Sequence, residues 1–293
     1  GTVVINGGTV TATTTGSGAA ISGSSVTIQG GTVTAQSNGS CDIYGTFSTG
    51  TSGSALIYAD VISDTSTQSS WSCLWVQKDA ATVYGSITLT DDMTLDGTLT
   101  VYTNGELTVN GTLTCQKGLV NNGILTNNGT VLVAGGDLDN RGTLAIAATG
   151  TLHVNGTPDA PRTLTNNGTL TVNGSLELDD TTLQNDSGTL DGTGLCVLTD
   201  KSENTGGGTT LRVEYRIFLD GNGATLTDTM LVTVEHKPVR LPTPTREDYR
   251  FDGWFTQAEG GTQVTAETTL TASQTVYAHW TLTATPTPTP TPT

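Results

Sequence analysis

Short phrases of alternating apolar and polar residues, each next to a glycine-containing corner, recur along most of the chain. The clearest run lies between Leu95 and Leu198, with Gly-Thr-Leu-Thr-Val at 97–101 and Asn-Asn-Gly-Thr-Leu-Thr-Val at 166–172. Apolar residues two positions apart point to one face of a strand, and Asn-Gly favours a sharp turn with a left-handed backbone. One phrase cannot bury its apolar face alone, so the repetition predicts a solenoid of stacked coils.

A longer repeat near the start of the chain gives the expected size of a coil. Residues 5–12 recur almost unchanged at 28–35, a spacing of 23. We therefore predict that residues 1–199 form a right-handed parallel β-helix with about three strands per coil. Ile, Val and Leu should point inward, and Thr should stack on the outside. The whole chain is expected to be all-β, because no segment shows a sustained apolar face at helical spacing.

Changes in composition divide the rest of the chain. Residues 200–212 are expected to be a linker, because 201–210 contain no apolar residue. Eight of the fifteen aromatic residues fall between Tyr215 and Trp280, which predicts a separate small domain at 213–281. Alternating Pro and Thr predict an extended spacer at 282–293.

Charge excludes several classes of partner. The formal net charge is -16, and residues 1–199 contain four basic residues: Lys78, Lys117, Arg141 and Arg162. Nucleic acid and anionic lipid both need clustered cations, so we expect neither as a partner. No apolar run is long enough to be inserted across a membrane. The sequence starts at Gly1 and ends in a Thr-Pro repeat, so we expect a mature product or an excised fragment.

The four cysteines indicate neither a metal site nor a bound cofactor. They stand at Cys41, Cys73, Cys115 and Cys196, without Cys-x-x-Cys or Cys/His spacing. Cys115 and Cys196 lie in apolar phrases and are expected in the core. Cys41 and Cys73 could pair only if adjacent coils placed them side by side, and we expect no disulfide there.

A loosened stretch at 38–84 contains the candidate binding residues. It is rich in Ser, Gly and Thr and includes Trp71, Trp75, Tyr44 and Tyr58. One interpretation is an aromatic platform, since aromatic faces stack on the apolar face of a sugar ring. The alternative, which we favour for the two tryptophans, is that they fold back over the core beneath a long loop.

The sequence gives only a weak indication of catalytic residues. Asp91, Asp92 and Asp96 would be required by the alternative function, a β-helix polysaccharide lyase or hydrolase acting through paired carboxylates. Neighbouring residues of a strand face opposite sides, so Asp91 and Asp92 form a pair only at a corner. His153 occupies an ordinary repeat position. Repeated Thr-x-Thr units are typical of ice-binding faces, but insertions interrupt them here. We therefore expect no enzymatic activity.

The segment Tyr215 to Trp280 carries a family resemblance. Its motifs are Ile-Phe-Leu-Asp-Gly-Asn-Gly at 217–223, Leu-Pro-Thr-Pro-Thr at 241–245, Tyr-Arg-Phe-Asp-Gly-Trp-Phe at 249–255, Gly-Gly-Thr at 260–262 and Val-Tyr-Ala-His-Trp at 276–280. In order and spacing they resemble the Listeria-Bacteroides repeat, the B-repeat module of internalin B and of many bacterial surface proteins. Asp248 stands where the family usually has Gly.

The resemblance implies a small β-grasp-like, non-enzymatic module of extracellular bacterial proteins. Five aromatic residues are expected to fill its core: Phe218, Phe251, Trp254, Tyr277 and Trp280. The solenoid phrases also resemble repetitive stalks of surface proteins from Gram-positive gut bacteria.

Together these features predict a bacterial cell-surface or secreted protein, in which a rigid β-helix stalk has a structural or adhesive role. The expected partners are a host or bacterial surface glycan or protein. A second copy of the chain is a further candidate, because Gly1 opens directly into a strand whose free edge could pair and build an extracellular filament.

Overall fold

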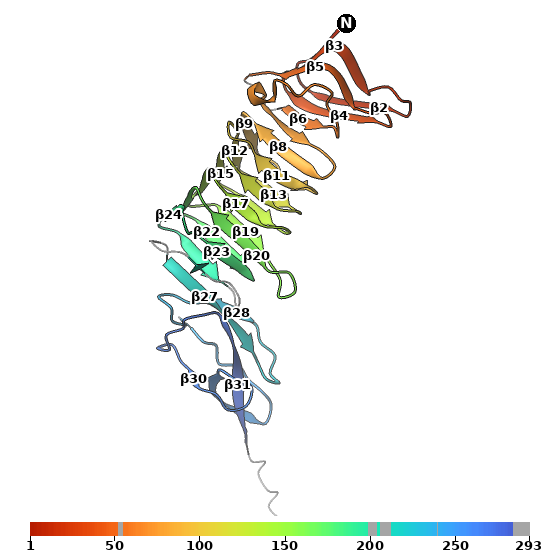
Figure 1. Cartoon of the computed structure of the whole chain (residues 1–293). Helices are drawn as coiled ribbons and strands as arrows, with labels where there is room; N and C mark the ends of the chain where they lie inside the picture. Colours follow the sequence, from red (N-terminus) through yellow and green to blue (C-terminus); the bar gives the residue numbers. More distant parts are fainter. Residues whose placement is uncertain (52–54, 199–203, 206–211, 239, 284–293) are drawn as a thin grey trace, which may run out of the picture. The chain divides into compact units, whose positions relative to one another are not determined.

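The computed structural model describes residues 1–51, 55–198, 204–205, 212–238 and 240–283. Most of the predicted linker at 200–212 and nearly all of the predicted spacer at 282–293 lie outside the described residues. The chain forms two compact units, one containing Gly1–Cys196 and the other containing the strands from Arg212 onward (Figure 1). Among the described residues, one short 3-10 helix (Gln68–Ser70) accompanies the strands, and no helix is long and apolar enough to span a membrane.

The first unit is a parallel β-solenoid, as predicted, and the whole chain is all-β. From β8 onward each coil contributes one strand to each of three sheets (Figure 1). Sheet I contains, in order, β2 (Thr9–Thr14), β4 (Gly31–Ser37), β6 (Ala55–Tyr58), β7 (Cys73–Val76), β8 (Ala80–Tyr84), β11 (Thr98–Val101), β14 (Leu119–Asn121), β17 (Leu138–Asn140), β20 (Arg162–Asn166), β23 (Thr181–Gln184) and β26 (Asn204–Thr205).

The other two sheets of the solenoid begin at the first full coil. Sheet II contains β9 (Ser86–Leu89), β12 (Glu106–Val109), β15 (Ile124–Asn127), β18 (Thr143–Ile146), β21 (Thr169–Val172) and β24 (Thr189–Asp191). Sheet III contains β10 (Met93–Leu95), β13 (Thr112–Cys115), β16 (Thr130–Val133), β19 (Thr151–Asn155), β22 (Ser175–Asp179) and β25 (Leu195–Leu198). A small separate sheet at the start contains β1 (Thr2–Ile5), β3 (Ile21–Ile28) and β5 (Ile43–Thr49).

Coil length varies. The register shifts between Ser22 and Ser25 of β3, but the pairs described next keep like residues opposite each other. Val10 pairs with Val33, 23 residues later, which matches the predicted spacing. Further along, Leu107 pairs with Leu125, 18 residues later, and Leu144 pairs with Leu170, 26 residues later. Extra residues are accommodated in the corners, so inward residues of successive coils still lie above one another. These inward side chains are almost fully buried, whereas the Thr residues between them are mostly half-buried on the outside.

A ladder of buried asparagines runs through one corner of the solenoid. Each asparagine occupies the same place in successive coils, and its Nδ2 donates to the Oδ1 of the next: Asn121 to Asn140 (2.8 Å), Asn140 to Asn166 (2.7 Å) and Asn166 to Asn185 (2.6 Å). The same Nδ2 groups also donate to backbone oxygens of the next coil, such as that of Thr169. The ladder starts at Asn121 because Val101 holds this position in the preceding coil.

The glycines of the corners are required for a different reason from the one the sequence suggested. We expected Asn-Gly to provide a left-handed backbone, but Gly123 and Gly168, which follow Asn, do not have a positive φ. Gly142, which follows Arg141 at the same corner, does not have one either. A Cβ atom on Gly142 would lie 2.0 Å from the carbonyl oxygen of Gly123, and one on Gly168 would lie 2.1 Å from that of Gly142. Glycine is therefore needed because successive coils touch at the corner.

Sheet I changes its buried face near the N-terminus. Strands β7 and β8 pair antiparallel, and the residue opposite Trp75 is Thr82. Opposite residues of paired strands share a face. Trp75 belongs to the core before β7, together with Ile57, whereas the face of Thr82 is the outside of the later coils. The early coils and the later coils thus bury opposite faces of one sheet.

The second unit contains a five-stranded sheet in the order β28 (Met230–Val232), β27 (Arg212–Asp220), β31 (Gln274–Leu282), β29 (Tyr249–Phe255) and β30 (Gln263–Val264). The central strands β27 and β31 are parallel, and the other pairs are antiparallel. Trp254 is buried and Trp280 and Phe251 pack against this core, as expected. Phe218 and Tyr277 instead are half-buried and lie outside that core cluster, because they alternate with the inward residues of their strands.

Asp248 illustrates a local departure that the fold tolerates. Its φ is 62°, in the left-handed region that favours glycine, so the Gly that the resemblance implies would fit this position without strain. Asp is among the residues that tolerate this conformation.

We expect the asparagine ladder to stabilise the solenoid measurably. Asn140→Ala removes both donor bonds and the acceptor of the previous rung, which leaves buried polar groups unsatisfied and should lower the free energy of unfolding by about 1–3 kcal/mol. Asn122→Ala, at a half-exposed asparagine of the same corner, should change it by less than about 0.5 kcal/mol. Urea denaturation followed by circular dichroism measures both, and equal effects would contradict a stabilising ladder.

Candidate functional site

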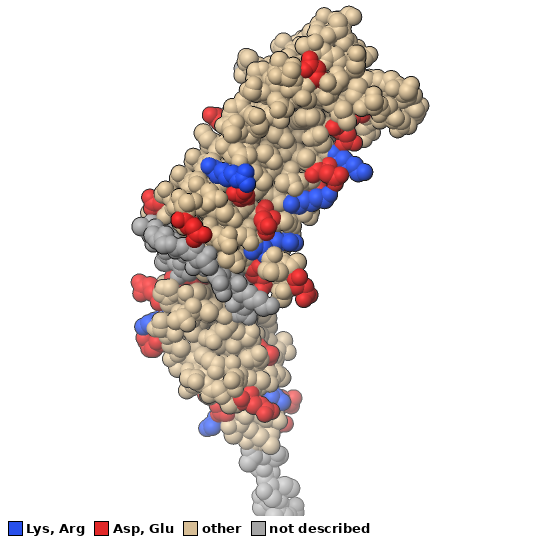
Figure 2. Space-filling model, viewed as in Figure 1, with Lys and Arg blue, Asp and Glu red and all other residues tan. Residues whose placement is uncertain are grey.

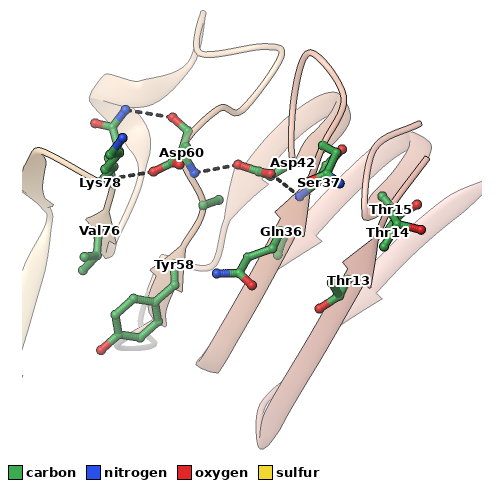
Figure 3. Close-up of a pocket in the computed structure, with 14 residues that line it drawn as sticks. Thr13, Thr14, Thr15, Gln36, Ser37, Asp42, Tyr58, Asp60, Val76 and Lys78 are labelled. Atoms are coloured by element: carbon green, nitrogen blue, oxygen red, sulfur yellow. Dashed lines mark hydrogen bonds between the residues drawn. The ribbon is translucent and has the colours of Figure 1, made fainter. Parts of the chain in front are cut away.

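A groove of 510 Å³ crosses the early strands of sheet I. It lies where β2, β4, β6 and β7 end, and it is lined mainly by polar side chains (Figure 3). The residues that give it its chemistry are Thr13, Gln36, Tyr58, Asp60 and Lys78.

Register brings these residues together. Thr13 of β2 pairs with Gln36 of β4, and Tyr58 of β6 pairs with Val76 of β7. All four lie on the outward face, which leaves hydroxyl, amide and phenol groups side by side (Figure 3). A ring that offers an apolar face beside hydrogen-bonding groups can hold a polar ligand with an apolar side.

The carboxylates of Asp42 and Asp60 stabilise the wall of the groove through hydrogen bonds. Asp42 is 6 % exposed, and it accepts backbone N–H bonds from Ser37 (2.7 Å), Asp60 (2.6 Å) and Val61 (3.0 Å). The carboxylate of Asp60 accepts the backbone N–H of Lys78 at 2.6 Å (Figure 3). These bonds from carboxylate side chains to backbone N–H groups connect three neighbouring corners and so hold the groove in shape.

The four aromatic residues proposed from the sequence do not form one platform. Trp71 is 1 % exposed and packs edge-on against Phe47, Trp75 and Tyr84. Trp75 is 8 % exposed, and its Nε1 donates to the carbonyl oxygen of Ala59 at 2.7 Å. Both indoles therefore fill the early core and offer no free ring face, which is the arrangement that we favoured for them.

The two tyrosines lie in different places. Tyr58 lines the groove, whereas Tyr44 is 60 % exposed on β5, in the separate small sheet. Thr13, Gln36 and Lys78 were not among the candidates, because nothing in the local sequence marks them. Only the register of the coils brings them next to Tyr58.

The acidic candidates occupy exposed corners of the first full coil. Asp91 and Asp92 lie between β9 and β10, and Asp96 follows β10. Asp92 accepts the backbone N–H of Thr112 at 2.8 Å. His153 lies in β19, three strands away along sheet III, where its Nε2 is 2.8 Å from a carboxylate oxygen of Asp179.

No cluster of three or more His, Cys, Asp or Glu side chains suited to a metal ion occurs within the described ranges. The cysteines Cys41, Cys73, Cys115 and Cys196 are all free.

Comparison with known proteins identifies the second unit. Residues 215–279 match the family model of the Listeria-Bacteroides repeat domain, which confirms the resemblance in the sequence. No curated protein and no solved structure matches the chain. A Listeria-Bacteroides repeat joined to a β-solenoid fits a bacterial surface protein.

The cysteines allow a direct test of the solenoid core. Burial raises the pKa of the Cys73, Cys115 and Cys196 thiols to about 12, so each stays protonated and unreactive at pH 8. Iodoacetamide should therefore modify only the half-exposed Cys41 in the native protein and all four cysteines in guanidinium chloride, as read by mass spectrometry. Rapid native labelling of Cys115 would contradict a closed core.

Proposed function

We propose that this chain is a non-enzymatic structural segment of a bacterial surface protein, located outside the cell, in which the solenoid is a stiff stalk. The observation that carries this proposal is the uninterrupted stacking of three-stranded coils from β8 onward. Each coil is bound to the next by backbone hydrogen bonds at its corners as well as along its strands, for example from Thr143 N to Gly123 O and from Thr169 N to Gly142 O, both 2.8 Å. Bending such a stack would break bonds in all three sheets, which favours a mechanical role.

The charges on the surface fit a protein that is exposed to solvent and do not fit one that binds nucleic acid. The net charge is -16. On the face drawn in Figure 2, the Lys and Arg side chains of the solenoid lie beside Asp and Glu side chains. Lys117 pairs with Asp79, and Arg141 pairs with Asp139. Paired cations are not available to bind phosphates, whereas an acidic surface keeps a β-rich protein soluble.

Immunogold electron microscopy of whole cells tests the location. Antibodies raised against the chain should label the outside of intact, unfixed cells of the native organism, and a strain that lacks the gene provides the control. Labelling that appears only in sections of permeabilised cells would contradict a surface stalk.

The groove supports a second function, contact with glycans. Tyr58 offers an aromatic ring, Gln36 and Thr13 offer hydrogen-bonding groups on the adjacent strands, and Lys78 offers a cation. A sugar presents an apolar ring face beside hydroxyl groups, which is the combination that such a groove fits.

A glycan array probed with the intact chain tests this second function. Tyr58→Ala should abolish binding or weaken it at least about tenfold, the usual cost of losing a central aromatic contact. Tyr44→Ala is the matched control, because Tyr44 is exposed on a different sheet, and it should leave binding unchanged. Binding that survives Tyr58→Ala and is lost in Tyr44→Ala would move the site away from the groove.

A further inference from the structure

Among the described residues, two strand edges of the first full coil of the solenoid have no neighbouring strand. Strand β9 ends sheet II and β10 ends sheet III, whereas in sheet I the place before β8 is taken by β7. Within the described part of the chain, the segment before β8 thus supplies a strand to one of the three sheets. The other two sheets end abruptly at this point.

Strand β9 has backbone groups that face this open edge. Glu106 N donates to Gly85 O (2.7 Å), and Asn110 N donates to Leu89 O (2.8 Å), so these acceptors face β12. In a parallel sheet, alternate residues direct their N–H and C=O groups to opposite neighbours. The groups of Thr88 therefore point to the open edge, where an added strand would find both a donor and an acceptor.

A cavity of 470 Å³, lined by both apolar and polar side chains, lies against the same edge. Leu56 and Leu74 line it from the outward face of β6 and β7, and Ile87, Leu89 and Met93 line it from the first full coil. It arises from the change of buried face between β7 and β8, because that change turns Leu74 toward the later core, opposite Val83. The cavity therefore lies where the inward side chains of an added strand would go.

The repeat itself indicates which side chains fit. In sheet II the inward position next to Ile87 holds Leu107, then Leu125, Leu144, Leu170 and Leu190. A strand placed before β9 would continue this column, so it needs a large aliphatic residue there and a second one two positions later. Beyond its last residue it would reach the corner of Asp91 and Asp92.

The charge at this corner indicates which type of residue should follow the second aliphatic residue of the added strand. Asp91 and Asp92 are both exposed and line the cavity. None of the described residues that line the cavity is basic. A Lys or Arg immediately after the second aliphatic residue would complement them.

We propose that the β9 edge binds an extended segment of a partner protein as an added parallel strand. The segment carries two aliphatic residues separated by one residue, which enter the cavity, followed by a basic residue next to Asp91. Backbone hydrogen bonds to Thr88 provide affinity, and the cavity and the carboxylates provide specificity.

The test uses the full chain and a fluorescein-labelled peptide, Gly-Thr-Leu-Thr-Val-Lys-Lys-amide, with fluorescence anisotropy as the measurement. We expect saturable binding with a Kd below about 1 mM. Methylating the backbone nitrogens of Leu and Val removes the donors that face β9 and should weaken binding at least about tenfold. Replacing the two Lys residues by Glu should weaken it to a similar extent.

Matched variants of the protein locate the site. Asp91→Lys places a cation at the corner and should raise the Kd about tenfold or more. Asp159→Lys makes the same charge change at an exposed aspartate outside the cavity and should change the Kd less than about twofold. Circular dichroism checks that both variants remain folded.

Three outcomes would overturn the proposal. They are absence of binding at 1 mM peptide, equal binding of the N-methylated peptide, and equal Kd values for the two lysine variants. Self-association of the chain that Asp91→Lys abolishes, without peptide binding, would instead identify a second copy as the occupant.

Discussion

The backbone hydrogen bonds between successive coils are the constraint on which the rest of the solenoid depends. Parallel strands approach to about 4.8 Å, so each residue lies directly above the residue one coil earlier. At that spacing inward side chains form columns, and a buried polar side chain needs a hydrogen-bond partner, which the next coil can provide. The asparagine column from Asn121 to Asn185 meets this need, because an amide is donor and acceptor at once. At the corners, where two backbones touch, glycine is needed because a Cβ atom would clash with the neighbouring coil.

This constraint explains which features could be predicted from the sequence. Alternation within a phrase is local, so the strands, the inward residues and the solenoid itself could be predicted. The roles of Asn121 and Gly142 depend on atoms one coil away, roughly twenty residues distant along the chain. Asn-Gly alone indicates a left-handed turn, whereas the stacked coils require a buried amide and space for a carbonyl oxygen. The family motifs of the second unit are also local, which is why they identified it.

The candidate groove was predictable only in part, for the same reason. Tyr58 could be proposed as an aromatic residue in a loosened stretch, but its neighbours Thr13 and Gln36 come from earlier coils. The sequence likewise could not show that sheet I changes its buried face at β7. That change places Trp75 in the early core and turns Leu74 toward the later one. Composition revealed the irregular region, whereas its geometry required the register of every strand.

Regular coils offer little for recognition, because each one covers the backbone and the apolar side chains of the one before. Recognition needs the exceptions, and here they gather around the junction of β7 and β8. Ending the early coils there leaves the groove at their outer corners and the cavity beside β9. Tyr58 lines both. The break that leaves β9 and β10 at the ends of their sheets thus lies next to both candidate binding surfaces, the groove and the cavity. A binding surface on a regular part of the solenoid would require additional loops between the strands. Here the change of buried face between β7 and β8 is enough to form one.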